Sequence, residues 1–155
     1  MSEDIETSGG CYCGQLRYTV RGLPLLSAFC HCTLCQRCNA APFIHTIHFS
    51  SAAFSWTRFE ESKVHIFEVT DNLDKPWKRR HRCANCGCTV AAFNIKKDKW
   101  SVWGAQLDRD DAGKRKNWEL LKPTAHNFYE TRMIDIADDL GKWDGYEGLS
   151  NRLLM

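Results

Sequence analysis

Nine cysteines in 155 residues constrain this chain more than any other feature of its sequence. They fall into three groups, and the densest, CHCTLCQRC, places four cysteines and a histidine within residues 30–38. Such a density of thiols is typical of a disulfide framework, of a structural metal site, or of a metal site with an open position. An odd number of cysteines leaves at least one thiol outside any disulfide pairing.

The composition and the N-terminal segment together favour metal binding over disulfide bonds. Hydrophobic residues make up 43% of the chain and charged residues 26%, the usual balance of a globular protein long enough for one core. The net charge of +2 predicts no overall attraction to nucleic acid or membrane. The segment MSEDIETSGG lacks the features of a signal peptide, and no apolar run approaches about 18 residues. We therefore expect a cytoplasmic protein, with the nucleus as the alternative, where clustered cysteines more often bind metal.

Short runs of β-branched and aromatic residues predict a mainly β, single-domain fold with little helix. Within residues 15–20, for example, Leu16, Tyr18 and Val20 alternate with polar residues. Further strands are expected over residues 25–29, 43–49, 63–69, 81–83, 88–95, 99–104, 126–130 and 132–136. We expect a flexible tail over residues 1–8, one domain over 9–150 and a polar loop over 106–117.

The first and last cysteine groups have the pattern of metal-binding turns. Cys83 and Cys86 are separated by two residues and followed by a glycine, which permits a tight turn that exposes backbone N–H groups to sulfur. Cys11 and Cys13 form a tighter version that also ends in a glycine. Together they supply the four thiolates of a closed, structural zinc site that ties the two ends of the domain together.

The central group leaves two interpretations open. Cys30, Cys32 and Cys35 can provide three thiolates and leave a fourth coordination position to an exchangeable ligand, which is the signature of a catalytic zinc. Alternatively, Cys38, His31 or a distant histidine closes the site, and this second metal is structural as well.

Taken together, these motifs resemble the glutathione-dependent formaldehyde-activating enzyme family, which also contains centromere protein V. The resemblance extends over roughly residues 9 to 148. The matching elements, in order, are Gly10-Cys11-Tyr12-Cys13-Gly14-x-x-Arg17-Tyr18, Cys30-His31-Cys32-x-x-Cys35-x-Arg37, Pro42-Phe43, Cys83-x-x-Cys86-Gly87, Lys122-Pro123-Thr124-x-His126, Asp135-Ile136-x-Asp138 and Trp143-Asp144-Gly145-Tyr146. The family implies an Mss4-like β fold, stapled by two zinc ions per chain.

The resemblance also implies that the two metal ions have different roles, one structural and one catalytic. The ligands of the structural zinc would be Cys11, Cys13, Cys83 and Cys86, and those of the catalytic zinc would be Cys30, Cys32 and Cys35. The implied activity is that of a carbon–sulfur lyase, which adds glutathione to formaldehyde to give S-hydroxymethylglutathione and catalyses the reverse step. Zinc bound by three thiolates suits this chemistry, because it lowers the pKa of an incoming thiol.

Three further residues are predicted to bind the substrate. They are His31, which lies between two predicted ligands, Arg37, and His126 in the Pro-Thr-x-His motif. For both histidines a purely structural role is the alternative. We expect a small-molecule thiol such as glutathione as the partner, rather than a membrane or nucleic acid, and the sequence does not predict the oligomeric state.

Residues 75–82, KPWKRRHR, form the only basic run. They fit the solvent-exposed face of a strand, an arginine fork for the carboxylates of glutathione, or a surface that contacts phosphate and bases. The last of these belongs to the alternative function, a non-catalytic binding module that is stapled by zinc and contacts a protein or nucleic acid through this run.

Overall fold

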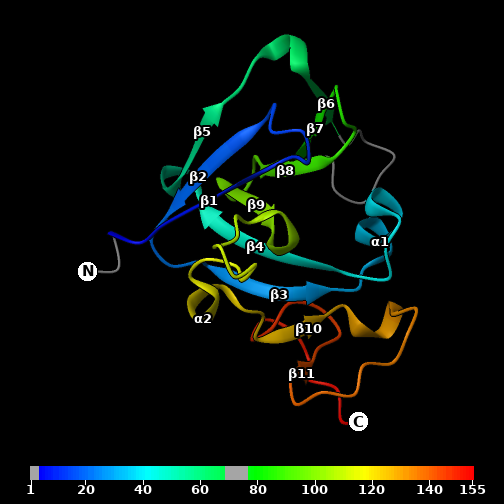
Figure 1. The fold of residues 1–155 in the computed structure, drawn as a ribbon. Coiled ribbons are helices and arrows are strands. Elements are labelled where there is room, and N and C mark those ends of the chain that lie inside the picture. The colour runs from blue at the N-terminus through cyan, green and yellow to red at the C-terminus, as the bar shows by residue number, and fades with distance from the viewer. Residues whose placement is uncertain (1–3, 69–76) are drawn as a thin grey trace.

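The computed structural model describes residues 4–68 and 77–155, which form two β-sheets with little helix (Figure 1). The small sheet contains, in spatial order, β1 (Glu6–Gly10), β2 (Arg17–Arg21) and β5 (Phe54–Arg58). The large sheet contains, in spatial order, β11 (Gly141–Lys142), β10 (Ala125–Asn127), β3 (Leu26–Cys30), β4 (Ile44–Ser50), β9 (Lys99–Trp103), β8 (Thr89–Asn94), β7 (Lys78–Cys83) and β6 (Val64–Glu68). The helices are α1 (Thr33–Asn39) and α2 (Trp118–Leu121), with 3₁₀ turns at Ser51–Ala53, Glu61–Lys63, Gly104–Gln106 and Tyr129–Thr131.

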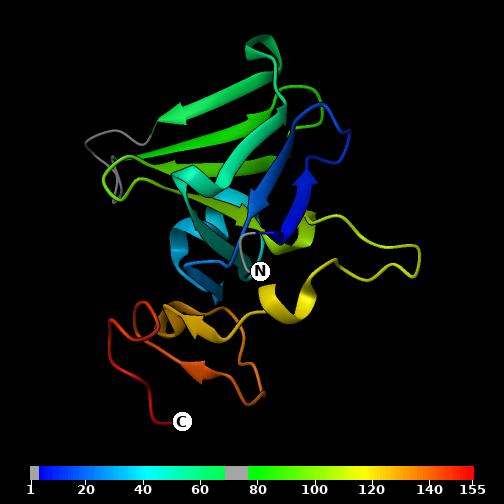
Figure 2. The same cartoon turned by 90° about the vertical axis from the view of Figure 1, so that its left-hand side faces the viewer.

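Aromatic side chains hold the two sheets together. Phe54 of β5 stacks on Tyr18 of β2 at 5.5 Å and on Trp100 of β9 at 4.2 Å. Trp56 of β5 lies 5.6 Å from His81 of β7. Figures 1 and 2 show the small sheet beside strands β7 to β9 of the large sheet. Burial of these large rings is a main source of stability, since each removes up to about 250 Å² from water.

The predicted mainly β class is confirmed. Leu16, Tyr18 and Val20 are buried as the alternation predicts, and the strands expected before residue 105 lie within a few residues of the observed ones. Within the described ranges, no helix is long and apolar enough to span a membrane.

Two expectations need correction. Residues 132–136 form no strand, and only the beginning of the run 126–130 does. The backbone N–H of Ile136 donates to the Tyr129 hydroxyl at 2.7 Å, so a side chain takes the place of a neighbouring strand. The tail predicted over residues 1–8 is also too long, because residues 6–8 pair with β2 in β1.

Strand β10 places the C-terminal part of the chain beside the central cysteine group. It runs parallel to β3, with His126 opposite Phe29 and Asn127 opposite Cys30. The C-terminal segment then follows β10, as Trp143 donates to the carbonyl of His126 at 2.9 Å. This pairing brings His126 next to residues that lie about a hundred positions earlier in the sequence.

Candidate functional site

Four of the predicted metal ligands meet between the two sheets. Cys11 and Cys13 lie in the turn between β1 and β2, and Cys83 and Cys86 lie at the turn between β7 and β8. All four sulfur atoms lie within 4.8 Å of one another, and the Sγ of Cys13 is 3.6 Å from those of Cys11 and Cys83. Because the first turn belongs to the small sheet and the second to the large sheet, a metal ion bound here would cross-link them. Four sulfurs are the donor set of many structural zinc sites.

Both turns have the backbone that the glycines predict. Gly14 and Gly87 adopt φ values of 76° and 78°, a region that residues with a Cβ rarely enter. The N–H of Gly87 donates to the carbonyl of Cys83 at 2.9 Å, and the N–H of Leu16 donates to the sulfur of Cys11 at 3.3 Å. Backbone N–H groups directed at sulfur stabilise the thiolate form that binds metal.

The central group forms a second cluster, of three sulfurs. Cys30 is the last residue of β3, Cys32 is the N-cap of α1, and Cys35 lies in the first turn of that helix. Their sulfur atoms lie within 4.8 Å of one another, and the N–H of Cys35 donates to the Sγ of Cys32 at 3.3 Å. The helix therefore begins on a cysteine, which caps the helix and faces the cluster at the same time.

The chemistry of this cluster fits a metal cation. Hydrogen bonds to the thiols of Cys32 and Cys35, followed by burial, raise the pKa of Cys30 well above its ordinary value. Three neighbouring thiols therefore resist ionising together unless a cation neutralises them. The described residues contain one cluster of four sulfurs and one of three that can hold a metal ion.

Cys38 does not belong to the three-sulfur cluster. It is exposed on α1 and lines a separate cavity of about 300 Å³, together with His65, Phe67, Arg80, Arg82 and Thr89, which we call the arginine pocket. The position of Cys38 therefore does not support the alternative in which it supplies a fourth ligand.

His31 and His126 form a buried hydrogen-bonded chain with Asp138. His31 Nε2 and His126 Nδ1 share a hydrogen bond at 2.8 Å, and His126 Nε2 donates to an Asp138 carboxylate oxygen at 2.8 Å. Both rings are fully buried. Burial, and then the proximity of His126, lower the pKa of His31 to about 4, so His31 is neutral near pH 7. Its Nδ1 has no hydrogen-bond partner among the residues that the structure describes.

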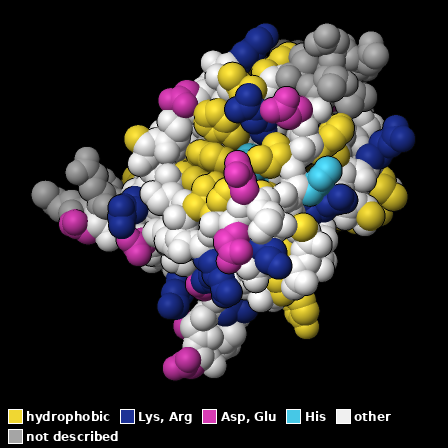
Figure 3. All heavy atoms as spheres, turned by 90° about the horizontal axis from the view of Figure 1, so that it is seen from above, with side chains coloured by type: hydrophobic (Ala, Val, Ile, Leu, Met, Phe, Trp, Pro, Cys, Tyr) yellow, Lys and Arg dark blue, Asp and Glu magenta, His cyan; other side chains and the backbone are white. Residues whose placement is uncertain are grey.

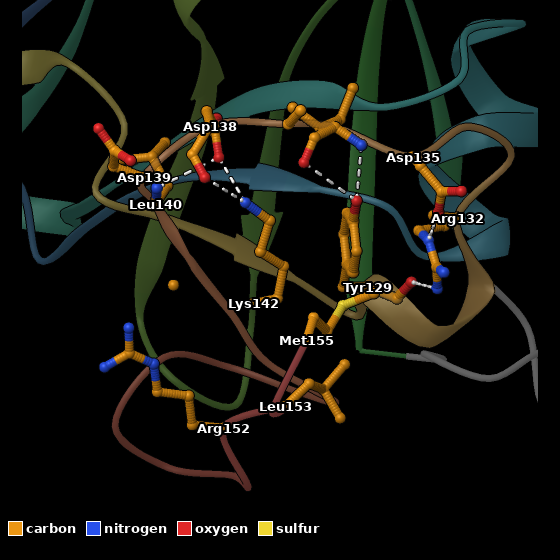
Figure 4. A pocket seen from close by; sticks show the side chains of 13 residues that line it. Tyr129, Arg132, Asp135, Asp138, Asp139, Leu140, Lys142, Arg152, Leu153 and Met155 are labelled. Carbon is orange, nitrogen blue, oxygen red and sulfur yellow. Dashed lines mark hydrogen bonds and ion pairs between the residues drawn. The ribbon is translucent and has the colours of Figure 1, made fainter.

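The outer end of this chain reaches an open pocket of about 460 Å³ near the C-terminus. Figure 4 shows the Lys142 ammonium directed at Asp138, with Tyr129 and Arg152 also in the lining. Burial alone would raise the pKa of Asp138, but hydrogen bonds from Lys142 and His126 lower it to about 2. Asp138 is therefore ionised and fixes the proton of His126 on Nε2.

The predicted substrate-binding residues lie in different surroundings. His126 uses both ring nitrogens within the chain, so none is left for a substrate unless one of these bonds breaks. Arg37 is exposed in the last turn of α1, where a cation also interacts favourably with the carboxyl end of the helix. Asp138, which holds His126, was part of the C-terminal motif, but its contact was not predicted.

A small cavity of about 20 Å³ adjoins the three-sulfur cluster. Cys30 and Cys35 form part of its lining, and so do the buried polar residues Thr46, Arg80 and Ser101. We call it the sulfur pocket. It holds on the order of one or two water molecules. A thiol sulfur and one carbon fit beside the cluster, whereas the body of a larger ligand must lie outside.

The alternation of strand β7 places neighbouring residues of the basic run in different surroundings. Arg79 is exposed and forms an ion pair with Glu68 at 2.9 Å, whereas Arg80 is buried against the sulfur pocket. Residues 75 and 76 of the run lie outside the described residues. The sequence alone did not predict that Arg79 is exposed and that Arg80 is buried.

Of the comparisons with known proteins, the one with family models identifies a family. Residues 6–131 match the sequence model of a family described as glutathione-dependent formaldehyde-activating enzyme. A solved structure of a Rhodobacter sphaeroides protein is 18% identical, with a TM-score of 0.49, and the match covers 70% of this chain and 96% of that one. A search of curated proteins finds no match.

Proposed function

Because the chain belongs to the glutathione-dependent formaldehyde-activating enzyme family, we propose that it joins the thiol of glutathione to formaldehyde at the three-sulfur cluster. In this reaction the S–H bond of the thiol breaks and a C–S bond forms to the carbonyl carbon. The proton ends on the former carbonyl oxygen, giving an S-hydroxymethyl product, and the reverse step is that of a carbon–sulfur lyase. The observation that carries the proposal is a three-sulfur cluster that opens on a cavity of about 20 Å³.

The two cysteine clusters would each hold one zinc ion. Cys11, Cys13, Cys83 and Cys86 would bind a structural zinc, and Cys30, Cys32 and Cys35 a catalytic one. A zinc ion in the second cluster would lower the pKa of a neighbouring substrate thiol, so that the reactive thiolate is present near pH 7. The donor sets support both assignments, since four sulfurs suit a closed site and three leave one position for a ligand.

The residues of the sulfur pocket complete the site. Its small volume favours a one-carbon carbonyl compound over a bulkier one. The Ser101 hydroxyl is buried in its lining and has no partner among the described residues, so it is available to donate a hydrogen bond to the carbonyl oxygen. The hydrogen bonds that link His31 to His126, and His126 to the Asp138 carboxylate, hold His31 in place between Cys30 and Cys32.

The experiment that tests this function uses the cobalt-substituted protein. Adding glutathione should change the cobalt absorption spectrum, because a sulfur ligand enters the open position of the three-cysteine site. The wild-type zinc protein should also accelerate the exchange of ¹³C-formaldehyde with its glutathione adduct, measured by NMR. Cys32→Ser should abolish both effects. A saturating concentration of glutathione that leaves the cobalt spectrum unchanged would contradict the proposal.

The surface charge gives less support to a nucleic-acid-binding module. Sequence-independent binding to nucleic acid needs a continuous basic surface. On the face shown in Figure 3, hydrophobic side chains gather near the centre and charges of both signs are scattered around them. Within the basic run, the pairing of Arg79 with Glu68 and the burial of Arg80 further reduce the exposed positive charge.

A further inference from the structure

Arg80 stands between two cavities. Its side chain lines both the sulfur pocket, beside Cys30 and Cys35, and the arginine pocket of about 300 Å³. Only 6% of the residue is exposed to solvent. A ligand whose sulfur lies in the sulfur pocket and whose body lies in the arginine pocket would therefore contact Arg80 on both sides.

The guanidinium group of Arg80 has an unused donor. Its Nε is buried and has no hydrogen-bond partner within residues 4–68 and 77–155. A buried donor of a charged group costs free energy when it is unpaired, so such groups normally have a partner. The neighbouring Arg79, by contrast, is exposed and has its partner in Glu68. The Nε of Arg80 therefore remains open to an acceptor from outside the described residues.

The other residues that line the arginine pocket favour an anionic ligand. In the register of β6 and β7, His65 lies opposite Arg82 and Phe67 lies opposite Arg80. The pocket thus presents two guanidinium groups beside an aromatic ring, and none of the described residues that line it is acidic. Guanidinium groups pair in a planar, two-point manner with carboxylates.

We propose that Arg80 and Arg82 bind a carboxylate of the thiol substrate and thereby direct its sulfur into the sulfur pocket. This rests on the proposed function and narrows it, because the enzyme would select thiols that carry an anionic group several bonds from the sulfur. Glutathione has two such carboxylates. Small neutral thiols would reach the cluster but lack this anchor.

A second cavity, of about 380 Å³, also adjoins the sulfur pocket through Lys78 and Tyr146. One of its cations, Lys99, already has partners, and the carboxylate of Glu147 in the same lining would repel an anion. The ammonium of Lys99 is 3.0 Å from His48 Nδ1 and lies over the ring of Tyr146 at 5.8 Å. The unpaired Nε of Arg80 therefore favours the arginine pocket as the carboxylate site.

Binding of S-methylglutathione tests the proposal by calorimetry on the metal-loaded protein. This probe keeps both carboxylates but has no thiol, so its affinity reports on the anchor alone. Arg80→Lys keeps the charge but loses the planar fork, and Arg82→Ala removes the exposed arginine of the pocket. Each should weaken binding by about 10-fold or more, the size expected for lost charge-assisted hydrogen bonds. Arg79→Ala, on the same strand but paired with Glu68, is the matched control and should bind like wild type.

The outcomes separate this inference from the proposed function. Wild-type affinity in both pocket variants would overturn the anchor. So would a wild-type protein that binds glutathione diethyl ester, which lacks both carboxylates, as tightly as glutathione. If S-methylglutathione binds as expected but glutathione leaves the cobalt spectrum unchanged, the anchor stands and the thiol chemistry at the cluster is wrong.

Discussion

Cys35 and Cys38 lie on the same short helix, yet only Cys35 faces the three-sulfur cluster. We predict that Cys35→Ser reduces the metal content from two ions per chain to one, because a three-cysteine site that loses a thiolate binds zinc far more weakly. Cys38→Ser is the matched control, and its metal content should stay at two. Elemental analysis of the purified proteins measures this directly. Loss of metal in Cys38→Ser would mean that the site is closed by a fourth sulfur.

The carboxylate of Asp138 controls a buried histidine without touching the sulfur cluster. We predict that Asp138→Asn lowers the rate of adduct exchange several-fold and broadens or shifts the imidazole N–H signal of His126 in ¹⁵N NMR spectra. The amide keeps the shape of the side chain, but it no longer fixes the proton of His126 on Nε2. Asp139→Asn changes the adjacent exposed carboxylate and should leave both measurements unchanged. An unchanged His126 signal in Asp138→Asn would refute this ordering role.

Single residues differ in how far the sequence could predict them. The cysteine groups are visible because ligands in one turn are two or three positions apart, a spacing that the sequence displays directly. The chain of His31, His126 and Asp138 is not visible in this way, since its members come together only when β10 pairs with β3. Arg80 escaped prediction because its burial depends on which face of β7 it occupies.

Strands and helices were likewise predicted only where the local sequence carries their signal. Strands with regular alternation, such as β2, were predicted within two residues of their bounds. The late run 132–136 failed because the backbone of Ile136 bonds to the Tyr129 hydroxyl instead of a neighbouring strand, while Met133 and Ile134 stay exposed, and the local sequence carries no signal for this. Helix α1 was not among the predicted elements, since its N-cap is a cysteine rather than the usual serine, threonine or aspartate.

The end of helix α1 offers a test of this element. Ala40 adopts a left-handed conformation with φ of 48°, and its N–H donates to the carbonyl of Gln36. We predict that Ala40→Gly stabilises the protein by about 0.5–1 kcal/mol, because glycine removes the steric cost of this conformation. Ala52→Gly, at an exposed alanine with negative φ, should instead destabilise by a similar amount. Urea unfolding measures both, and a stabilisation by both substitutions would contradict the argument.

In the whole molecule, the two sulfur clusters have different structural tasks. The four-sulfur cluster joins a turn of the small sheet to a turn of the large sheet, whereas the three-sulfur cluster lies within the large sheet and α1. The binding free energy of a metal ion at the first cluster would therefore be part of the free energy that holds the sheets together. At the second cluster, the surrounding strands are already paired on both sides.

This difference predicts unequal effects of two serine substitutions on thermal unfolding. Cys13→Ser should lower the Tm by roughly 10 °C or more, since about 1 kcal/mol corresponds to 2–4 °C in a chain of this size. Cys13 is exposed, so little packing is lost and the effect reports on the metal. Cys32→Ser should shift the Tm by only a few degrees, because serine also serves well as the N-cap of α1. A chelator, which removes metal from both clusters, should bring wild type to the Tm of Cys13→Ser or a few degrees below it. If the two variants melt alike, the clusters share one role and the assignment of a structural and a catalytic zinc is wrong.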